Sequence, residues 1–202
     1  MYLILVRQLC KKYEVVTEMT TAGVRSVVPL NLDSLQLGLP GITPVIGSSF
    51  AEASRLCFCY HGHPVGVQLI VEGDFTATYE VSWSGDVTDQ ERDSWQDQQE
   101  LTESGACGVA ILLILELTEY TVIRRAMKGT GIDYWLGHKE DTAPFQSAAR
   151  LEISGILSGD SSKVQHRVRE KLQQTSPTDG KLTAHVVVVE FSRPTASVLV
   201  KA

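Results

Sequence analysis

The sequence lacks the features that mark a membrane protein or a secreted one. Its longest apolar run, Val109–Leu115, has only seven residues and ends at Glu116, whereas a helix needs about 20 apolar residues to span a bilayer. The first residues are apolar before they are basic, which is the reverse of the order in a secretory signal peptide. We therefore expect a cytoplasmic protein that makes no contact with a membrane.

Cysteine is scarce as well. The four cysteines are Cys10, Cys57, Cys59 and Cys107, and no two of them form a CxxC pair. A chain of 202 residues, 43% of them hydrophobic, can bury a sizeable core without disulfide bonds. Buried free thiols are the simplest interpretation of these cysteines.

Basic residues are scarce in the front half of the chain. Residues 1–119 hold 6 Lys and Arg against 16 Asp and Glu, a net charge of −10, whereas residues 120–202 hold 12 against 8, a net charge of +4. The front half would repel a phosphate backbone, but the back half can tolerate one. A nucleic-acid enzyme that acts alone is usually more basic. We therefore expect any DNA contact through the C-terminal half, and either a protein partner or a homo-oligomer.

The pattern of the first 99 residues predicts an acidic, β-rich region that packs on a core formed by residues 100–202. Pro40 and Pro44 predict a loop over residues 31–49, followed by a short helix from Phe50 that Ser48 or Ser49 caps. Residues 84–99 are either a helix that Asp89 caps or a solvated loop. The predicted strands are Tyr2–Val6, Val24–Leu30, Arg55–His61, Val65–Val71 and Phe75–Trp83.

The second half has clearer periodicity. An almost uniformly apolar pattern predicts a buried helix over residues 100–118, in which Gly105 and Gly108 permit close backbone approach. A second helix, capped by Asp160 or Ser161, runs to about Gln174 and is ended by Pro177 and Gly180. The predicted strands are Tyr120–Ala126, Ile132–Leu136, Arg150–Ile156, a strand buried on both faces at Ala184–Phe191, and an edge strand at Ala196–Val200. This order, α-β-β-β-α-β, predicts a three-layer α/β core with an N-terminal β-rich extension.

Two short segments in this core, GTGIDYWL and ARLEISG, resemble the PD-(D/E)XK, or restriction-endonuclease-like, nuclease superfamily over residues 100–191. In that family an acid lies near the start of the second core strand, and a second acid and a lysine follow as (D/E)-x-K on the third. The resemblance implies that Asp133 and Glu152 are these acids. Glu103 is the best match for a third acid from the first helix, and Glu100, one turn earlier, competes with it. Ser154 stands where the lysine belongs. Some members carry the basic residue on the following helix, where Lys163 and Lys171 are available.

The strand pattern agrees with a shared site. Residues two apart on a strand point to the same face, so Glu152 and Ser154 share one face of their strand. Converging carboxylates suit Mg²⁺, which prefers oxygen ligands and keeps several waters. We expect Mg²⁺ or Mn²⁺ as the cofactor if the site is active. The alternative is that Asp133 and Glu152 are ordinary exposed acids, or ion-pair partners for the basic residues Arg124, Arg125 and Arg150.

Other motifs give weaker predictions. Cys57, Cys59, His61 and His63 have donor types that suit zinc, but ligands two apart on a strand lie about 6.5 Å from each other, which strains a tetrahedral site. Cys107 lacks a recognisable base, so a thiol nucleophile is disfavoured. The segment Lys128–Gly131 is a hairpin turn rather than a P-loop, although its amides, with the basic residues Lys128, Arg167 and Lys171, offer contacts to nucleic acid.

The sequence therefore predicts a Mg²⁺-dependent DNA nuclease, a hydrolase, or a nuclease-like subunit of a restriction, repair or defence system. Asp133, Glu152 and Glu103 would hold the metal, and Lys163 or Lys171 would supply the missing charge. The alternative is a catalytically inactive protein of the same fold that acts as an interaction or assembly subunit. Ser154 and the acidic front half favour this alternative.

Overall fold

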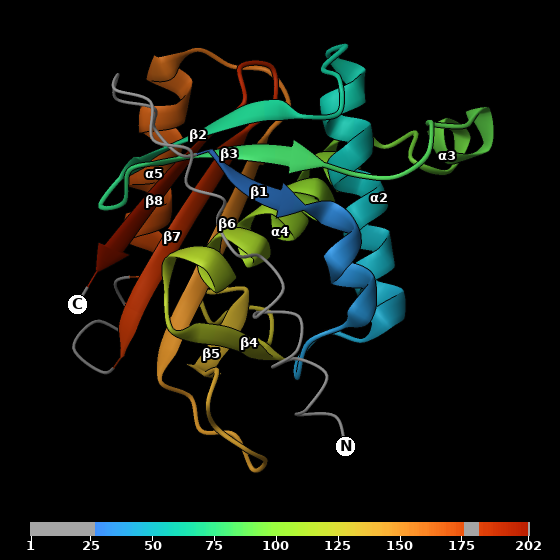
Figure 1. The fold of residues 1–202 in the computed structure, drawn as a ribbon. Coiled ribbons are helices and arrows are strands. Elements are labelled where there is room, and N and C mark those ends of the chain that lie inside the picture. The colour runs from blue at the N-terminus through green and yellow to red at the C-terminus, as the bar shows by residue number, and fades with distance from the viewer. Residues whose placement is uncertain (1–26, 176–181, 202) are drawn as a thin grey trace, which may run out of the picture.

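The computed structural model describes residues 27–175 and 182–201. The chain forms three layers, in which a central mixed sheet carries helices on both faces (Figure 1). The predicted strand Tyr2–Val6, the cysteine Cys10 and the helix terminators Pro177 and Gly180 lie outside the described residues.

One continuous sheet of eight strands forms the central layer, in the order β1-β3-β2-β8-β7-β6-β5-β4. The β1–β3, β2–β8 and β6–β7 pairs are parallel and the others are antiparallel. The strands are β1 (Val28–Asn31), β2 (Val67–Gly73), β3 (Ala77–Ser82), β4 (Tyr120–Arg125), β5 (Tyr134–His138), β6 (Ala149–Ile156), β7 (Thr183–Glu190) and β8 (Thr195–Lys201).

The order predicted for residues 100–191 is observed: α4 (Gln98–Leu117), then β4, β5 and β6, then α5 (Ser161–Gln174) and β7. Strand β7 is buried along almost its whole length, as predicted for a strand covered on both faces. The prediction that Ala196–Val200 is an edge strand is wrong. Strand β8 pairs with β7 on one side and β2 on the other, so it joins the strands of the acidic front half to those of the back half.

The two faces of the sheet can be told apart along β6. Gly155 faces α4, where a Cβ atom on this residue would lie 2.4 Å from the carbonyl oxygen of Thr102. Ile156 faces the other way and packs, with Val186 and Val188 of β7, against the apolar side chains of α5. Glu152 and Ser154 alternate in step with Ile156, so they lie on the α5 face.

The front half contains a helix that is longer at both ends than the short one expected from Phe50. Residues Pro44–Tyr60 form α2, so the predictions of a loop at Pro44 and a strand over Arg55–His61 are wrong. Thr43 caps this helix, and Pro44 occupies its first turn, where a missing N–H does no harm. A 3₁₀ helix, η1 (Leu32–Leu37), precedes it. The acidic segment forms a short helix, α3 (Asp89–Ser94), which Thr88 caps, rather than a loop.

Helix α4 packs against α2 at two glycines. A Cβ atom on Gly108 would lie 2.3 Å from Ser54 Oγ and 2.9 Å from the carbonyl oxygen of Phe50, and Gly105 meets Cys57 in the same way. Within the described ranges, neither these nor the other helices have the length and apolar character that a bilayer span requires.

The packing at Gly108 gives a prediction about stability. Alanine favours a helix over glycine by about 1 kcal/mol, but overpacking of a core costs about 1–3 kcal/mol. We expect Gly108→Ala to lower the free energy of unfolding by up to about 2 kcal/mol, the difference between these two effects, measured by urea denaturation. Gln99→Ala, on an exposed part of the same helix, should change it by less than about 0.5 kcal/mol. A more stable Gly108→Ala protein would contradict this description of the α2–α4 contact.

Candidate functional site

The pairing of β5 with β6 brings Asp133 and Glu152 together. Tyr134 stands opposite Leu151 in the antiparallel register, so the residue before Tyr134 stands opposite the residue after Leu151. The Asp133 N–H donates to the carbonyl oxygen of Leu151 at 2.9 Å, and the Ile153 N–H donates to Asp133 Oδ2 at 2.8 Å. These bonds fix the Asp133 carboxylate against β6, on the α5 face beside Glu152.

Glu152 is almost completely buried, with 1% of its surface exposed. Lys171, from the last turns of α5, places Nζ 2.5 Å from Glu152 Oε1. The other carboxylate oxygen, Oε2, is buried and has no hydrogen-bond partner among the described residues. A buried acceptor without a partner is costly, so this atom marks a place where a proton or a cation would be favourable.

The environment raises the pKa of both acids. Burial and the neighbouring charge of Asp133 raise the pKa of Glu152 to about 7, although the contact with Lys171 acts in the opposite direction. Burial also raises the pKa of Asp133, against the Ile153 hydrogen bond and the charge of Lys171. The two carboxyl groups are close enough for a hydrogen bond when one of them is protonated. The pair therefore tends to hold a proton near neutral pH unless another cation replaces it.

The acid pair opens into a cavity of about 430 Å³. Its walls are Asp133, Glu152 and Lys171, together with Gln174 and the turn at residues 128–132. The turn approaches the end of α5 closely, because a Cβ atom on Gly131 would lie 2.5 Å from the carbonyl oxygen of Gln174. This contact has no signature in the sequence, so Gln174 was not expected at the site.

Ser154 occupies the position where the family resemblance places a lysine, and it is buried on the same face as Glu152. Arg167 of α5 donates from Nη1 to Ser154 Oγ at 2.8 Å. Two cations of one helix thus reach the side chains of β6 at alternate positions, Arg167 to Ser154 and Lys171 to Glu152. Positive charge is therefore present beside the acids, although it comes from α5 and not from the strand.

Two other predicted site residues lie elsewhere. Glu103 is exposed on α4, on the opposite side of the sheet, where it accepts a hydrogen bond from Gln99 at 2.9 Å. Lys163 Nζ donates to the carbonyl oxygen of Ser158 at 2.8 Å. In residues 27–175 and 182–201, no three His, Cys, Asp or Glu side chains converge as a metal-ligand set. The structure brings together Asp133, Glu152 and Lys171, with Lys128 at the cavity wall.

The arginines that the alternative interpretation would pair with these acids make other contacts. The guanidinium of Arg124 lies 5.8 Å from the ring centroid of Trp135, and that of Arg125 lies 6.0 Å from the ring of Tyr134. Arg150 is buried and donates to the carbonyl oxygens of Leu182 and Thr175. Glu152 is thus neither an exposed strand acid nor an arginine partner.

The cysteine and histidine segment does not form a zinc centre. Cys57 is buried in α2, with Sγ 3.6 Å from the carbonyl oxygen of Leu101, and Cys59 packs on the core. His61 and His63 follow the helix and place Nε2 atoms 2.6 Å and 3.0 Å from the carbonyl oxygens of Leu157 and Phe191. These side chains hold the end of α2 against the residues that directly follow β6 and β7. Burial raises the pKa of the Cys107 thiol to about 12, which disfavours a nucleophilic thiolate.

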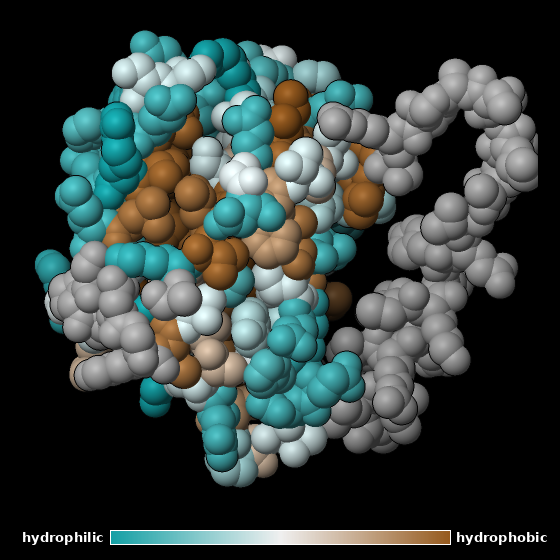
Figure 2. Space-filling model, turned by 90° about the vertical axis from the view of Figure 1, so that its left-hand side faces the viewer, coloured by the Kyte–Doolittle hydropathy of each residue, from teal (hydrophilic) through white to brown (hydrophobic). Residues whose placement is uncertain are grey.

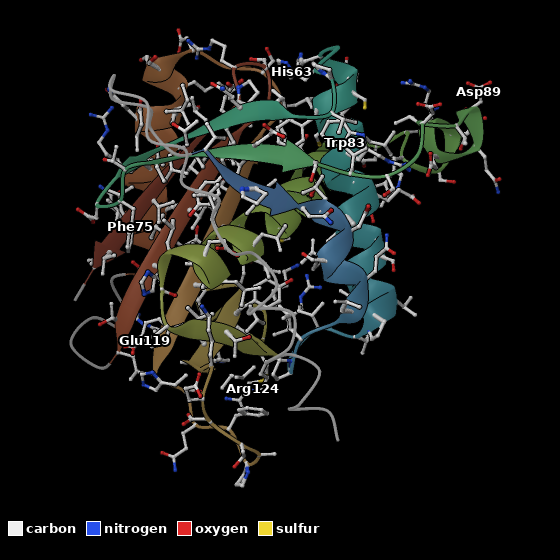
Figure 3. All side chains as sticks on the ribbon, viewed as in Figure 1. His63, Phe75, Trp83, Asp89, Glu119 and Arg124 are labelled. Carbon is white, nitrogen blue, oxygen red and sulfur yellow. The ribbon has the colours of Figure 1, made fainter. Side chains whose placement is uncertain are left out.

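A second cavity, of about 440 Å³, lies beside the C-terminal end of α4. Phe75 and Glu119 belong to its lining and are labelled on the left of Figure 3. Its lining also contains His185, whose pKa burial lowers. Figure 2 views the molecule from that side and shows brown apolar side chains gathered between teal hydrophilic ones. Among the described residues, no lysine lines this cavity.

Comparison with known proteins gives no relative. No family model matches the chain, and no curated protein or solved structure is significantly similar to it. The fold and the site define its class as a mixed α/β protein with an eight-stranded sheet. In it the buried Glu152, the half-buried Asp133 and Lys171 share one cavity.

The raised pKa of Glu152 predicts how stability depends on pH. The folded protein binds the proton of the Glu152 carboxyl more tightly than the unfolded chain does. The contribution of this proton to the unfolding free energy is therefore complete below about pH 4.5 and is lost as the pH rises through about 7. In the unaltered protein, the unfolding free energy should fall by on the order of 2 kcal/mol between these two pH values. We expect Glu152→Gln to make this decline smaller. Urea denaturation across this pH range measures it.

Glu72→Gln is the matched control, because Glu72 is an exposed acid on β2. It should keep the slope of the unaltered protein. An equal slope in the Glu152→Gln protein would show that another group titrates.

Proposed function

We propose that this protein is a divalent-cation-dependent phosphodiesterase that acts on DNA, built on a PD-(D/E)XK-like core. The observation that carries the proposal is the meeting of Asp133, Glu152 and Lys171 in one cavity. Two carboxyl groups on neighbouring strands, with a lysine touching one of them, have the donor types that a hydrolytic phosphoryl-transfer site needs. The order of elements from α4 to β7 supports the same assignment.

The residues at the site fit a magnesium ion. Mg²⁺ is usually held by one or two carboxylates and keeps several of its waters, so the pair suffices without Glu103. Glu152 Oε2 is a buried acceptor that has no donor in the part of the chain that the structure describes. A cation would satisfy it and relieve the repulsion between the acids. When bound, such an ion supplies an activated water and polarises a phosphoryl oxygen.

The chain's own cations have a distinct role in this proposal. Lys171 neutralises Glu152 and faces the cavity, so its ammonium group can stabilise negative charge on a phosphoryl group there. Arg167 is held at Ser154, next along the same face, and Lys128 lies at the cavity wall. Lys171 thus takes the part that the resemblance gives to the strand lysine.

The proposal predicts metal-dependent cleavage. With Mg²⁺ or Mn²⁺, the purified protein should cut plasmid or single-stranded DNA. Asp133→Ala, Glu152→Gln and Lys171→Met should each lower the rate by about 100-fold or more, the usual effect of removing a group that stabilises transition-state charge. Gel analysis of labelled DNA measures the rate.

Glu103→Ala is the matched control, because Glu103 is an acid of the predicted set that lies across the sheet from the pair. It should retain full activity. Products that are equal in the unaltered protein and in Asp133→Ala would come from a contaminant and would remove the proposal.

Metal binding can be tested without DNA. A cation and a proton compete for the pair, so Mn²⁺ should raise the melting temperature more at pH 8 than at pH 6. At 100 times its dissociation constant the ion should stabilise the fold by about 2.7 kcal/mol. Differential scanning calorimetry measures this, and Asp133→Ala should abolish it. A shift that is the same in Asp133→Ala would place the ion elsewhere.

A second candidate function is a catalytically inactive subunit of the same fold that binds a protein partner. The apolar patch in Figure 2 and the serine at position 154 favour it. In that case the acid pair and Lys171 are a structural ion pair, and neither metal stabilisation nor cleavage is expected.

A further inference from the structure

Trp135 differs from the other tryptophans in its surroundings. Trp83 is 8% exposed and stacks on Phe58 within the core. Trp95 packs on the same core and donates from Nε1 to Glu52 at 2.7 Å. Trp135 is only partly buried and belongs to neither apolar cluster of the described residues. The core therefore does not explain why a large aromatic side chain stands at this position.

The position of Trp135 relative to the acid pair follows from strand geometry. It is two residues after Asp133, so it lies on the same face of the sheet, roughly 7 Å further along. Its cross-strand partner in β6 is Arg150, two residues before Glu152. The Trp135–Arg150 pair and the Asp133–Glu152 pair are therefore neighbours on the same face of the sheet.

Helix α5 covers neighbouring strands on this face but does not cover Trp135. Helix α5 packs on β6, β7 and β8 through Val164, Val168 and Leu172. Trp135 lies on β5, towards the edge strand β4. Its neighbour there is Arg124, which is exposed and stands opposite it in the β4–β5 register.

The Arg124–Trp135 contact shows what the ring accepts. The guanidinium is a flat cation whose centre lies 5.8 Å from the centroid of the indole ring. A nucleobase is also flat and stacks on aromatic rings and on guanidinium planes. Lys128, at the cavity wall, adds positive charge that favours a phosphate backbone between this ring and the cavity.

We infer that Trp135 and Arg124 form a stacking platform for an unpaired nucleobase beside the acid pair, so that the substrate is single-stranded or locally unpaired nucleic acid. The inference rests on the proposed function. A base inside a duplex is already stacked on both of its faces, so it cannot reach the indole ring unless the duplex opens. A single strand can place one base on the platform while the adjacent phosphate enters the cavity.

The test measures binding separately from cleavage. The unaltered full-length protein is titrated into a fluorescein-labelled oligothymidylate in EDTA, and fluorescence anisotropy gives the dissociation constant. Trp135→Ala should weaken single-strand binding by about 5- to 100-fold, the range that corresponds to one stacked base. Trp135→Phe should restore most of the affinity, because it keeps an aromatic face. A duplex of the same length should bind more weakly than the single strand and should not respond to Trp135→Ala.

Tyr60→Ala is the matched control, since Tyr60 is an exposed aromatic residue at the end of α2. It should leave binding unchanged, and thermal denaturation of each variant confirms that it is folded. Equal single-strand affinity in the unaltered protein and in Trp135→Ala would overturn the platform. So would a duplex that binds as tightly as the single strand.

The two proposals can fail separately. Loss of cleavage in Asp133→Ala together with unchanged binding in Trp135→Ala would keep the phosphodiesterase and remove the platform. Absence of any cleavage, together with single-strand binding that depends on Trp135, would remove the phosphodiesterase and leave a binding site for single strands.

Discussion

A carboxylate that water barely reaches needs a counter-charge, and Glu152 is the residue at which this requirement is most severe. It lies in the middle of the sheet, under α5, with Asp133 beside it. Lys171 satisfies one of its oxygens, and within residues 27–175 and 182–201 the other has no partner. A stable fold would be easier to build with an apolar residue here, and this cost is what motivates the proposed cation site.

The rest of the architecture supports this pair. Gly155 lets α4 approach one face of β6. On the other face, the apolar side chains of α5 cover the end of the strand at Ile156. The site lies where that cover ends, at the last turns of α5 and the turn between β4 and β5. The acids are therefore shielded enough for their pKa values to rise, while the cavity still opens to solvent. The strands of the acidic front half, β1, β3 and β2, join the same sheet through β8. In the strand order, β8 and β7 separate them from the site on β6 and β5.

Predictions from sequence succeeded where a segment has a long apolar run or one clear period. The apolar pattern of α4, the continuous run of β7 and the basic amphipathic α5 all gave the correct type of element. Predictions failed for α2, whose first turn contains Pro44 and whose last residues, Cys-Phe-Cys-Tyr, have the composition of a strand. Burial against α4 decided the outcome there, because residues at helical spacing face the two glycines of that helix. Local propensity is weaker than such packing.

The sequence by itself determined the order of elements in the second half, the alternation that sets Glu152 and Ser154 on one face of β6, and the presence of cations on α5. These properties depend on residues close together in the chain. Only the tertiary structure decided that Lys171 reaches Glu152, that Lys163 does not, and that Glu103 lies across the sheet from the acid pair. The physical reason is that the face on which a helix packs, and the register of two strands, arise from contacts between residues far apart in sequence, which no local pattern encodes.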